Sequence, residues 1–403
     1  MRKIIIIIVL IIIVFFIALF VYFYPSLNPV LGPPPEDISQ LLPQGNNNLN
    51  QPLTAKPVYP ILEKWQYVDH GPLTILGNLQ IEVFAENFKK PRVLLFDQKG
   101  NLLVSAMNEG SIYAIQPDQT KIKLISGLNN PHGLELKLGY LYIAETNGVS
   151  RYAYDEDDLM LGPAEKLFAL PDDGGHNTRT IKFGQDNNLY VAVGSSCNVC
   201  QEKDERRSAI LKYDPQDWSY EIFAKSLRNT VFFIEHPQTK EFWGNDMGRD
   251  LLGDNLPPDE LNIIKANQDY GWPICYGNKI HDTNFDKNTY IRNPCEDTIG
   301  QVFGYPAHNS PLGLVLIDSP IFPKEWQGDI LVALHGSWNR SVPDGYKVVH
   351  LRLEGDKVIV MQDFLTGFLT DKGAIGRPVD LVFGPDQALY LSDDKAGVIY
   401  RIY

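Results

Sequence analysis

The stretch TIKFGQDNNLYVAVG, residues 180–194, decides the fold. Its two apolar runs have the composition of short β-strands, and the Gln-Asp-Asn-Asn run at 185–188 has that of a tight turn. The preceding residues GGHNTR, 174–179, predict a polar loop in which two glycines come directly before His176. This loop–strand–turn–strand pattern is the unit on which most of the chain is built.

The same unit recurs six times after about residue 79. Each copy has a polar loop, an inner strand, a Gly/Asp/Asn turn and further strands, and the copies begin near residues 91, 131, 174, 228, 311 and 377. Four short strands in each of six units predict an all-β fold, a six-bladed β-propeller of four-stranded blades. A β-sandwich and a β-helix are the alternatives, but units of roughly 40 to 60 residues are too long for a β-helix coil.

The ends of the repeat predict how the ring closes. The sixth unit reaches the C-terminus without an outer strand, whereas a spare strand at residues 79–84 precedes the first unit. We expect this N-terminal strand to complete the last blade, because pairing the two ends removes an open sheet edge.

The N-terminal 60 residues differ from the repeats. Residues 4–24 are apolar almost without a break, which is enough to span a bilayer, and Arg2 and Lys3 precede them. We interpret residues 1–24 as an uncleaved transmembrane anchor, with a cleaved signal peptide as the alternative. Residues 25–60 are interpreted as a Pro/Asn-rich stalk and residues 61–403 as a propeller domain that lies extracytoplasmically, in a periplasm or at a cell surface.

Four cysteines are present, at positions 197, 200, 275 and 295. An extracytoplasmic location permits disulfides, and four cysteines allow three pairings. We expect Cys197 to pair with Cys200 and Cys275 with Cys295, because each pair is close in sequence. A zinc site at the C-x-x-C pair is the alternative, but no second pair of ligands lies nearby.

Basic residues recur in phase with the repeat. The net charge of −13 argues against nucleic-acid binding, so an anionic ligand would need a local cationic cluster. In a propeller, the loop that enters each inner strand lies at the central channel. The basic and amide side chains at this position are Arg92, His132, His176 with Arg179, Arg228 with Asn229, His308 and Arg377. They predict a channel mouth that binds an anion through charge-assisted hydrogen bonds.

Two groups in these loops suggest chemistry. His176 is a candidate general base, because the ordinary pKa of histidine lies near neutrality; a solvated or capping histidine is the alternative. The segment 245–260 is rich in Asp, Asn and Glu, and such oxygen-rich loops suit Ca²⁺, although a solvated acidic loop would have the same composition.

Several segments, in the order of the repeats, resemble the glucose/sorbosone dehydrogenases, which are six-bladed quinoproteins. They are residues 174–179 with 193–198, 227–229, 259–262 with 270–273, 335–340 and 377–380. The resemblance covers the chain from about residue 79 to the C-terminus and is greatest to the sorbosone dehydrogenase branch. It implies a pyrroloquinoline quinone (PQQ) cofactor and a Ca²⁺ ion bound to it.

The resemblance also implies roles for single residues. His176 corresponds to the catalytic base, and Arg228 to the arginine over the reactive carbonyl of the quinone. The backbone carbonyls of Gly248 and Arg249 would hold the Ca²⁺. Further cofactor contacts are expected from Asn229, Arg377, Arg340, Arg179, His132 and Trp338.

Two positions depart from the family pattern. Gly175 stands where soluble glucose dehydrogenases carry an acidic residue, so the group that orients His176 is unassigned. Ser196 stands where those enzymes carry a glutamine, which argues against glucose itself as the substrate.

Together, these observations predict a membrane-anchored, PQQ-dependent dehydrogenase that oxidises an aldose or a related aldehyde and passes hydride to the quinone. The sequence does not identify the electron acceptor. The alternatives are a metal-dependent lactonase on the same fold, which would need a carboxylate and amide cage in the channel, and a non-enzymatic extracellular binding module.

Overall fold

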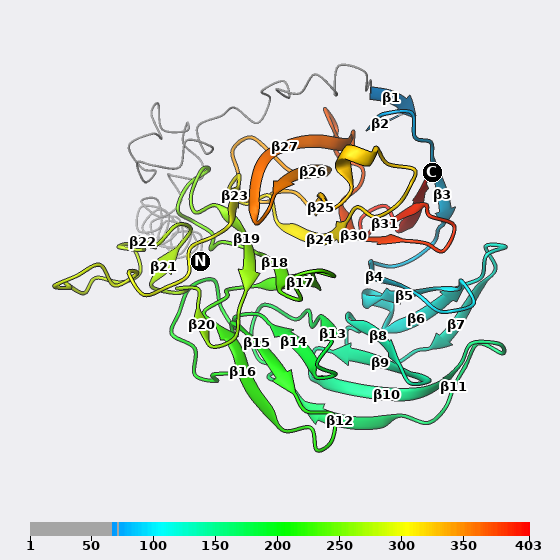
Figure 1. Cartoon of the computed structure of the whole chain (residues 1–403), viewed down its shortest axis with the longest axis horizontal. Helices are drawn as coiled ribbons and strands as arrows, with labels where there is room; N and C mark the ends of the chain where they lie inside the picture. Colours follow the sequence, from blue (N-terminus) through cyan, green and yellow to red (C-terminus); the bar gives the residue numbers. More distant parts are fainter. Residues whose placement is uncertain (1–66, 71) are drawn as a thin grey trace, which may run out of the picture.

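The computed structural model describes residues 67–70 and 72–403. Six of their β-sheets are arranged around a central axis, as a β-propeller, and two small two-stranded sheets lie outside this ring (Figure 1). The fold class predicted from the repeats is therefore confirmed. The predicted anchor (1–24) and stalk (25–60) lie outside the described residues and stay predictions. Within the described part of the chain, no helix is long and apolar enough to cross a membrane.

Each blade contributes one strand to each of four concentric layers. The innermost strands are β4 (Pro91–Phe96), β8 (Leu134–Lys137), β13 (Ile181–Phe183), β17 (Thr230–Glu235), β24 (Pro311–Leu316) and β30 (Pro378–Phe383). The second strands are β5 (Leu102–Ala106), β9 (Tyr140–Glu145), β14 (Leu189–Val193), β18 (Phe242–Asp246), β25 (Ile330–Leu334) and β31 (Leu389–Asp393). The third strands are β6 (Ser111–Ile115), β10 (Gly148–Asp155), β15 (Ala209–Tyr213), β19 (Asp259–Ile264), β26 (Lys347–Glu354) and β32 (Val398–Ile402). The outermost strands are β7 (Lys121–Ile125), β12 (Glu165–Ala169), β16 (Tyr220–Lys225), β23 (Phe303–Tyr305), β27 (Lys357–Thr366) and β3 (Ile81–Ala85).

Short elements decorate this frame. The hairpin of β1 (Tyr67–His70) and β2 (Leu73–Leu76) extends the fifth blade by pairing with β27. Strand β11 (Met160–Leu161) pairs with β10, and β20 (Gln268–Asp269) runs parallel to β16. The remaining pieces are the hairpins β21 (Cys275–Tyr276)–β22 (Ile280–His281) and β28 (Leu369–Thr370)–β29 (Gly373–Ala374), and two 3₁₀ turns, η4 (Met107–Glu109) and η5 (Lys324–Trp326).

The turn between β13 and β14 follows the composition of its residues. The Gly184 N–H donates to the Asn188 carbonyl, and Asp186 Oδ1 accepts the Asn188 N–H. Asn187 has a φ of 67°, which asparagine tolerates better than most residues. β14 is buried along its whole length, because neighbouring blades cover both of its faces.

The ring closes as the sequence predicts. β3 pairs antiparallel with β32, so a strand from the start of the domain becomes the outermost strand of the last blade. In Figure 1 the blue β3 lies beside the red C-terminal strands. Both expected disulfides, Cys197–Cys200 and Cys275–Cys295, are formed, and the described residues contain no free cysteine to bind zinc.

The closing seam should be sensitive to truncation of its buried side. Ile402 is fully buried and lies opposite Ile81 and Leu389. Ile402→Ala is expected to lower the free energy of unfolding by about 2–5 kcal/mol, because it leaves a cavity at the seam. Val83 is 49% exposed on the same seam, so Val83→Ala is the control and should change stability by about 0.5 kcal/mol. If denaturant unfolding gives the same loss of unfolding free energy for Ile402→Ala and Val83→Ala, this closure is contradicted.

Candidate active site

A cavity of about 380 Å³ opens where the loops before the innermost strands converge. Of the predicted residues, Arg92, His176, Arg228, Asn229, Gly248, His308, Trp338 and Arg377 line it. These residues come from five of the six blades, as expected for loops in phase with the repeat. The lining includes four cationic side chains (Lys90, Arg92, Arg228 and Arg377) and two carboxylates (Asp250 and Asp259). The mouth therefore gathers positive charge in an otherwise acidic chain.

Ser195 orients the imidazole of His176. The Nδ1 atom lies 2.9 Å from the Ser195 carbonyl oxygen and 2.9 Å from Ser195 Oγ. A carbonyl only accepts hydrogen bonds, so Nδ1 carries the ring proton and Nε2 keeps its lone pair. Gly194 makes room for this arrangement: a Cβ there would lie 2.9 Å from His176 Cβ and would overlap Asn229 Oδ1. Ser195 is thus the orienting group that the sequence left unassigned.

The environment of His176 keeps the ring neutral. Burial, followed by the nearby Arg228 charge, lowers the pKa of His176 to about 3. The imidazole is therefore unprotonated at neutral pH and can accept a proton at Nε2, which has no hydrogen-bond partner among the described residues. The free Nε2 lone pair gives the ring the geometry of a general base, and the lowered pKa makes it a weaker proton acceptor than an ordinary histidine.

Arg228 is held by oxygen atoms of the protein. Its Nε donates to the Asn198 carbonyl at 2.9 Å and its Nη2 to Asn198 Oδ1 at 3.0 Å. Its Nη1 donates to the carbonyls of Met247 and Gly248 at 3.1 and 2.9 Å, and Asp250 lies 3.5 Å from Nη2. Because these contacts use its donors, Arg228 acts on the cavity as a fixed positive charge.

A second cationic wall faces the cavity from the first and last blades. Arg92 pairs with Asp394 at 2.9 Å, and His335 Nε2 lies 2.9 Å from the other oxygen of that carboxylate. Arg377 donates through Nε to the His335 carbonyl at 3.1 Å. The half-buried Lys90 ammonium makes no hydrogen bond or ion pair within the described residues, and burial followed by the Arg92 charge lowers its pKa below the ordinary value. Lys90 is thus the cation of this wall that is free to bind an anion.

Three predicted cofactor residues lie outside the cavity lining. His132 is fully buried, with Nδ1 3.3 Å from the Arg179 carbonyl. Arg179 is also fully buried and donates to the carbonyls of His176, Thr178 and Pro171 at 2.9, 2.7 and 2.6 Å. Arg340 donates to the carbonyls of Ala307 and Asp254. These three residues are not part of the cavity lining, and most of their polar groups bind loop backbone, so their expected contact with a cofactor stays a prediction.

The predicted calcium ligands do not form a free pair. The Gly248 carbonyl already accepts an N–H from Arg228, so a guanidinium stands where a metal cation was expected. Arg249 is not part of the lining, and its side chain pairs with Asp282 at 2.8 Å. As arranged, Gly248 offers no free carbonyl to a bound Ca²⁺, while the expected role of the Arg249 backbone carbonyl stays a prediction. Among the described residues, the one cluster of three His, Cys, Asp or Glu side chains with metal-like spacing is Cys197, Cys200 and Glu202, whose sulfurs form a disulfide.

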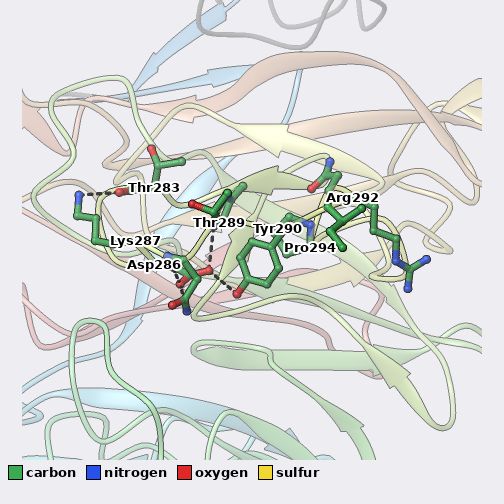
Figure 2. Close-up of a pocket in the computed structure, with 11 residues that line it drawn as sticks. Thr283, Asp286, Lys287, Thr289, Tyr290, Arg292 and Pro294 are labelled. Carbon is green, nitrogen blue, oxygen red and sulfur yellow. Dashed lines mark hydrogen bonds and ion pairs between the residues drawn. The ribbon is translucent and has the colours of Figure 1, made fainter.

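A larger open hollow lies elsewhere, in the excursion closed by Cys275–Cys295, and Figure 2 shows its lining. Its polar groups bind one another. Asp286 Oδ2 accepts the Tyr290 hydroxyl at 2.7 Å and lies 2.9 Å from His281 Nε2, while Asp286 Oδ1 accepts the Asn288 amide at 2.7 Å. These contacts explain the loop conformation and leave the cavity at the channel mouth as the candidate active site.

Sequence reasoning missed several lining residues. Lys90 lies one position before an inner strand, so a wider window in the repeat would have found it. Asp250 and Asp259 were assigned to an acidic loop, and both line the cavity. Burial raises the pKa of Asp259 to about 7, although its oxygens accept the backbone N–H groups of Gly248 and Ser310 at 2.9 and 2.8 Å. Asp259 fixes the loop next to Arg228.

Comparisons with known proteins agree with this architecture. The chain matches the family described as TrAA12-like over residues 73–403. An uncharacterized protein of Borreliella burgdorferi is 31% identical over 354 residues, covering 82% of this chain and 90% of that protein. A pyrroloquinoline quinone-dependent pyranose dehydrogenase of Coprinopsis cinerea is 22% identical, covering 82% of this chain but 54% of that protein.

Solved structures show the same fold at low sequence identity. The calcium structure of the Trichoderma reesei Carbohydrate-Active Enzymes Family AA12 protein has a TM-score of 0.71 at 21% identity, covering 84% of this chain and 96% of that chain. The holo form of the pyranose dehydrogenase PQQ domain from Coprinopsis cinerea has a TM-score of 0.69 at 19% identity, covering 84% and 97%.

The neutral state of His176 can be measured without any ligand. We expect its ring signals, followed by NMR in the cofactor-free protein, to titrate near pH 3 rather than near the ordinary value of about 6.5. Arg228→Met removes the strongest neighbouring charge and should raise this pKa. A titration of His176 near pH 6.5 would contradict the buried geometry.

Proposed function

The chain belongs to the TrAA12-like family, and on that premise we propose that it is a PQQ-dependent sugar oxidoreductase. The observation that carries the proposal is a neutral, tautomer-fixed imidazole beside a fixed guanidinium in a cavity with a cationic wall. The proposed substrate class follows that of a relative, the PQQ-dependent pyranose dehydrogenase of Coprinopsis cinerea. The resemblance of short motifs to glucose/sorbosone dehydrogenases leads to the same class, with an aldose or a related aldehyde as substrate.

The cavity fits an anionic cofactor. PQQ carries three carboxylates, and the wall of Lys90, Arg92 and Arg377 offers cations to hold them. The Arg92 Nε is buried and unpartnered within the described residues, as is Asn339 Oδ1 on the cavity lining. Such buried polar atoms cost free energy until a ligand or water binds them, so they favour an occupant with hydrogen-bonding groups.

The residues of the chain divide the chemical work. Bound PQQ would supply a two-electron acceptor for the hydride that leaves the sugar carbon. His176 would take the hydroxyl proton at Nε2, because Ser195 holds the other ring nitrogen. Arg228 would stabilise negative charge that develops in the cavity, as a charge already in position. The proton would thus go to His176 and the hydride to the quinone, and the hydroxyl would become a carbonyl.

Calcium is not part of this proposal, because the Gly248 carbonyl is bound to Arg228. The predicted membrane anchor at residues 1–24 and the extracytoplasmic location are proposed from the sequence alone. The electron acceptor that reoxidises the quinone is not assigned. The lactonase alternative gains no support from the site, since its lining is dominated by cations and its two carboxylates already bind Arg228 or backbone N–H groups.

Reconstitution tests the proposal. The full chain is mixed with PQQ, with and without Ca²⁺, and then supplied with a dye acceptor and a panel of aldoses and aldehydes. We expect the visible band of PQQ to shift on binding, and the dye to be reduced with at least one sugar. His176→Ala should keep the shift and lose about 10²–10⁴-fold in kcat, because only the base is removed. No band shift and no turnover with any substrate would remove the proposal.

Lys90 should contribute to PQQ affinity. Lys90→Met removes the free ammonium of the cationic wall, and a charge-assisted hydrogen bond is worth about 1.5–3 kcal/mol. The dissociation constant for PQQ should therefore rise roughly 10–100-fold in an optical titration. Lys89→Met, at the exposed neighbouring position, is the matched control and should leave the affinity unchanged. Equal effects of the two variants would contradict the assigned wall.

A further inference from the structure

We propose that the small ring closed by Cys197–Cys200 is a positioning element for both His176 and Arg228, and that Asn198 is its positioning residue. The inference rests on the proposed function for the roles of His176 and Arg228. It goes beyond that function because it assigns a task to a segment that contains neither of them.

One side of the ring holds the base. Ser195 Oγ donates to the Cys197 carbonyl at 2.7 Å, so the hydroxyl oxygen is left to accept the Nδ1–H of His176 at 2.9 Å. The direction of this relay is fixed, since the carbonyl at its end only accepts. Cys197 therefore determines where the serine hydroxyl points, and the serine determines the orientation of the imidazole.

The other side of the ring holds the cation. Asn198 offers Arg228 two acceptors, its carbonyl to Nε at 2.9 Å and its Oδ1 to Nη2 at 3.0 Å. The same Oδ1 accepts the Asp250 N–H at 2.7 Å, and the Asn198 amide donates to the Asp250 carbonyl at 3.2 Å. Asn198 thus joins Arg228 to the loop of the fourth blade that carries Asp250.

The disulfide explains how an irregular loop can do this. Residues 194–208, between β14 and β15, form no strand or helix. A covalent link three positions apart limits the backbone conformations available to Asn198, while Glu202 accepts the Ser196 N–H and hydroxyl at 2.7 Å on the outer side. The second disulfide, Cys275–Cys295, closes the excursion of residues 275–295. Within the described residues, neither of its cysteines makes a hydrogen bond to His176 or Arg228.

Breaking the ring should therefore impair turnover more than cofactor binding. Lys90 and Arg92 lie on the first blade and Arg377 on the sixth, and no hydrogen bond joins them to Asn198 within the described residues. His176 and Arg228 both do, and a displacement of about 1 Å at such groups can cost roughly 100-fold in rate. The predicted signature is a loss in kcat with little change in the dissociation constant for PQQ.

Three variants of the full chain test this: Cys197→Ser with Cys200→Ser, Asn198→Ala, and Asn198→Asp. We expect kcat to fall tenfold or more in the first two, and Asn198→Asp to recover part of it, because Asp keeps the acceptor for Arg228. Asn284→Ala, at an exposed position of the outer excursion, is the matched control. Thermal unfolding of each variant separates loss of positioning from loss of fold, and Asn198→Ala keeps the disulfide intact.

A second measurement does not depend on the proposed function. In the cofactor-free protein, the Arg228 Nε–H should exchange slowly with solvent and exchange faster in the ring variants, and the pKa of His176 should move up from about 3 as Arg228 moves away. If the Arg228 Nε–H exchange rate and the His176 pKa stay native-like in both the double cysteine variant and Asn198→Ala, the inference is overturned. If these signals change but no variant or native protein turns over, the positioning stands and the proposed function fails.

Discussion

The pairing of β3 with β32 is the constraint on which the rest of the structure depends. It joins the start of the domain to its end, so every blade has a neighbour on both sides, and second strands such as β5, β14 and β31 are buried along their whole length. A closed ring also forces the six loops before the innermost strands toward one axis (Figure 1). Residues separated by hundreds of positions, such as Arg92 and Asp394, meet there as a buried ion pair.

Backbone carbonyls hold most of the arginines near this axis. Arg179 binds three of them, Arg228 three, and Arg340 and Arg377 at least two each. A guanidinium has five donors in a rigid fork, and loop carbonyls at a channel mouth have no strand partner, so each group satisfies the other. The arginines therefore serve two tasks. Some stabilise the loops, and those that also face the cavity give it a positive field.

Much of this arrangement follows from the sequence. The apolar runs and the Asp/Asn turns predict strands, the count of units predicts six blades, and the spare N-terminal strand predicts the closure. The cysteine pairs follow from their proximity along the chain. His176 and Arg228 lie at the cavity because their loops keep phase with the repeat, and phase is visible in a linear sequence.

The direction in which each long side chain points cannot be predicted from the linear sequence. His132 and Arg179 keep the same phase, yet both side chains are buried against backbone carbonyls of the loop of residues 171–180. Gly248 was expected to bind a metal cation and binds the cation of Arg228. Lys90 and Ser195 were missed, since their importance comes from what surrounds them in space: a pair of arginines for Lys90 and the imidazole of His176 for Ser195.

A crystal structure of the chain grown with PQQ tests the central claim most directly. We expect electron density for the quinone in the cavity at the channel mouth, with its carboxylates on Lys90, Arg92 and Arg377 and with His176 still bound to Ser195. PQQ at another site, or a cavity that stays empty of it at saturating concentration, would contradict the account.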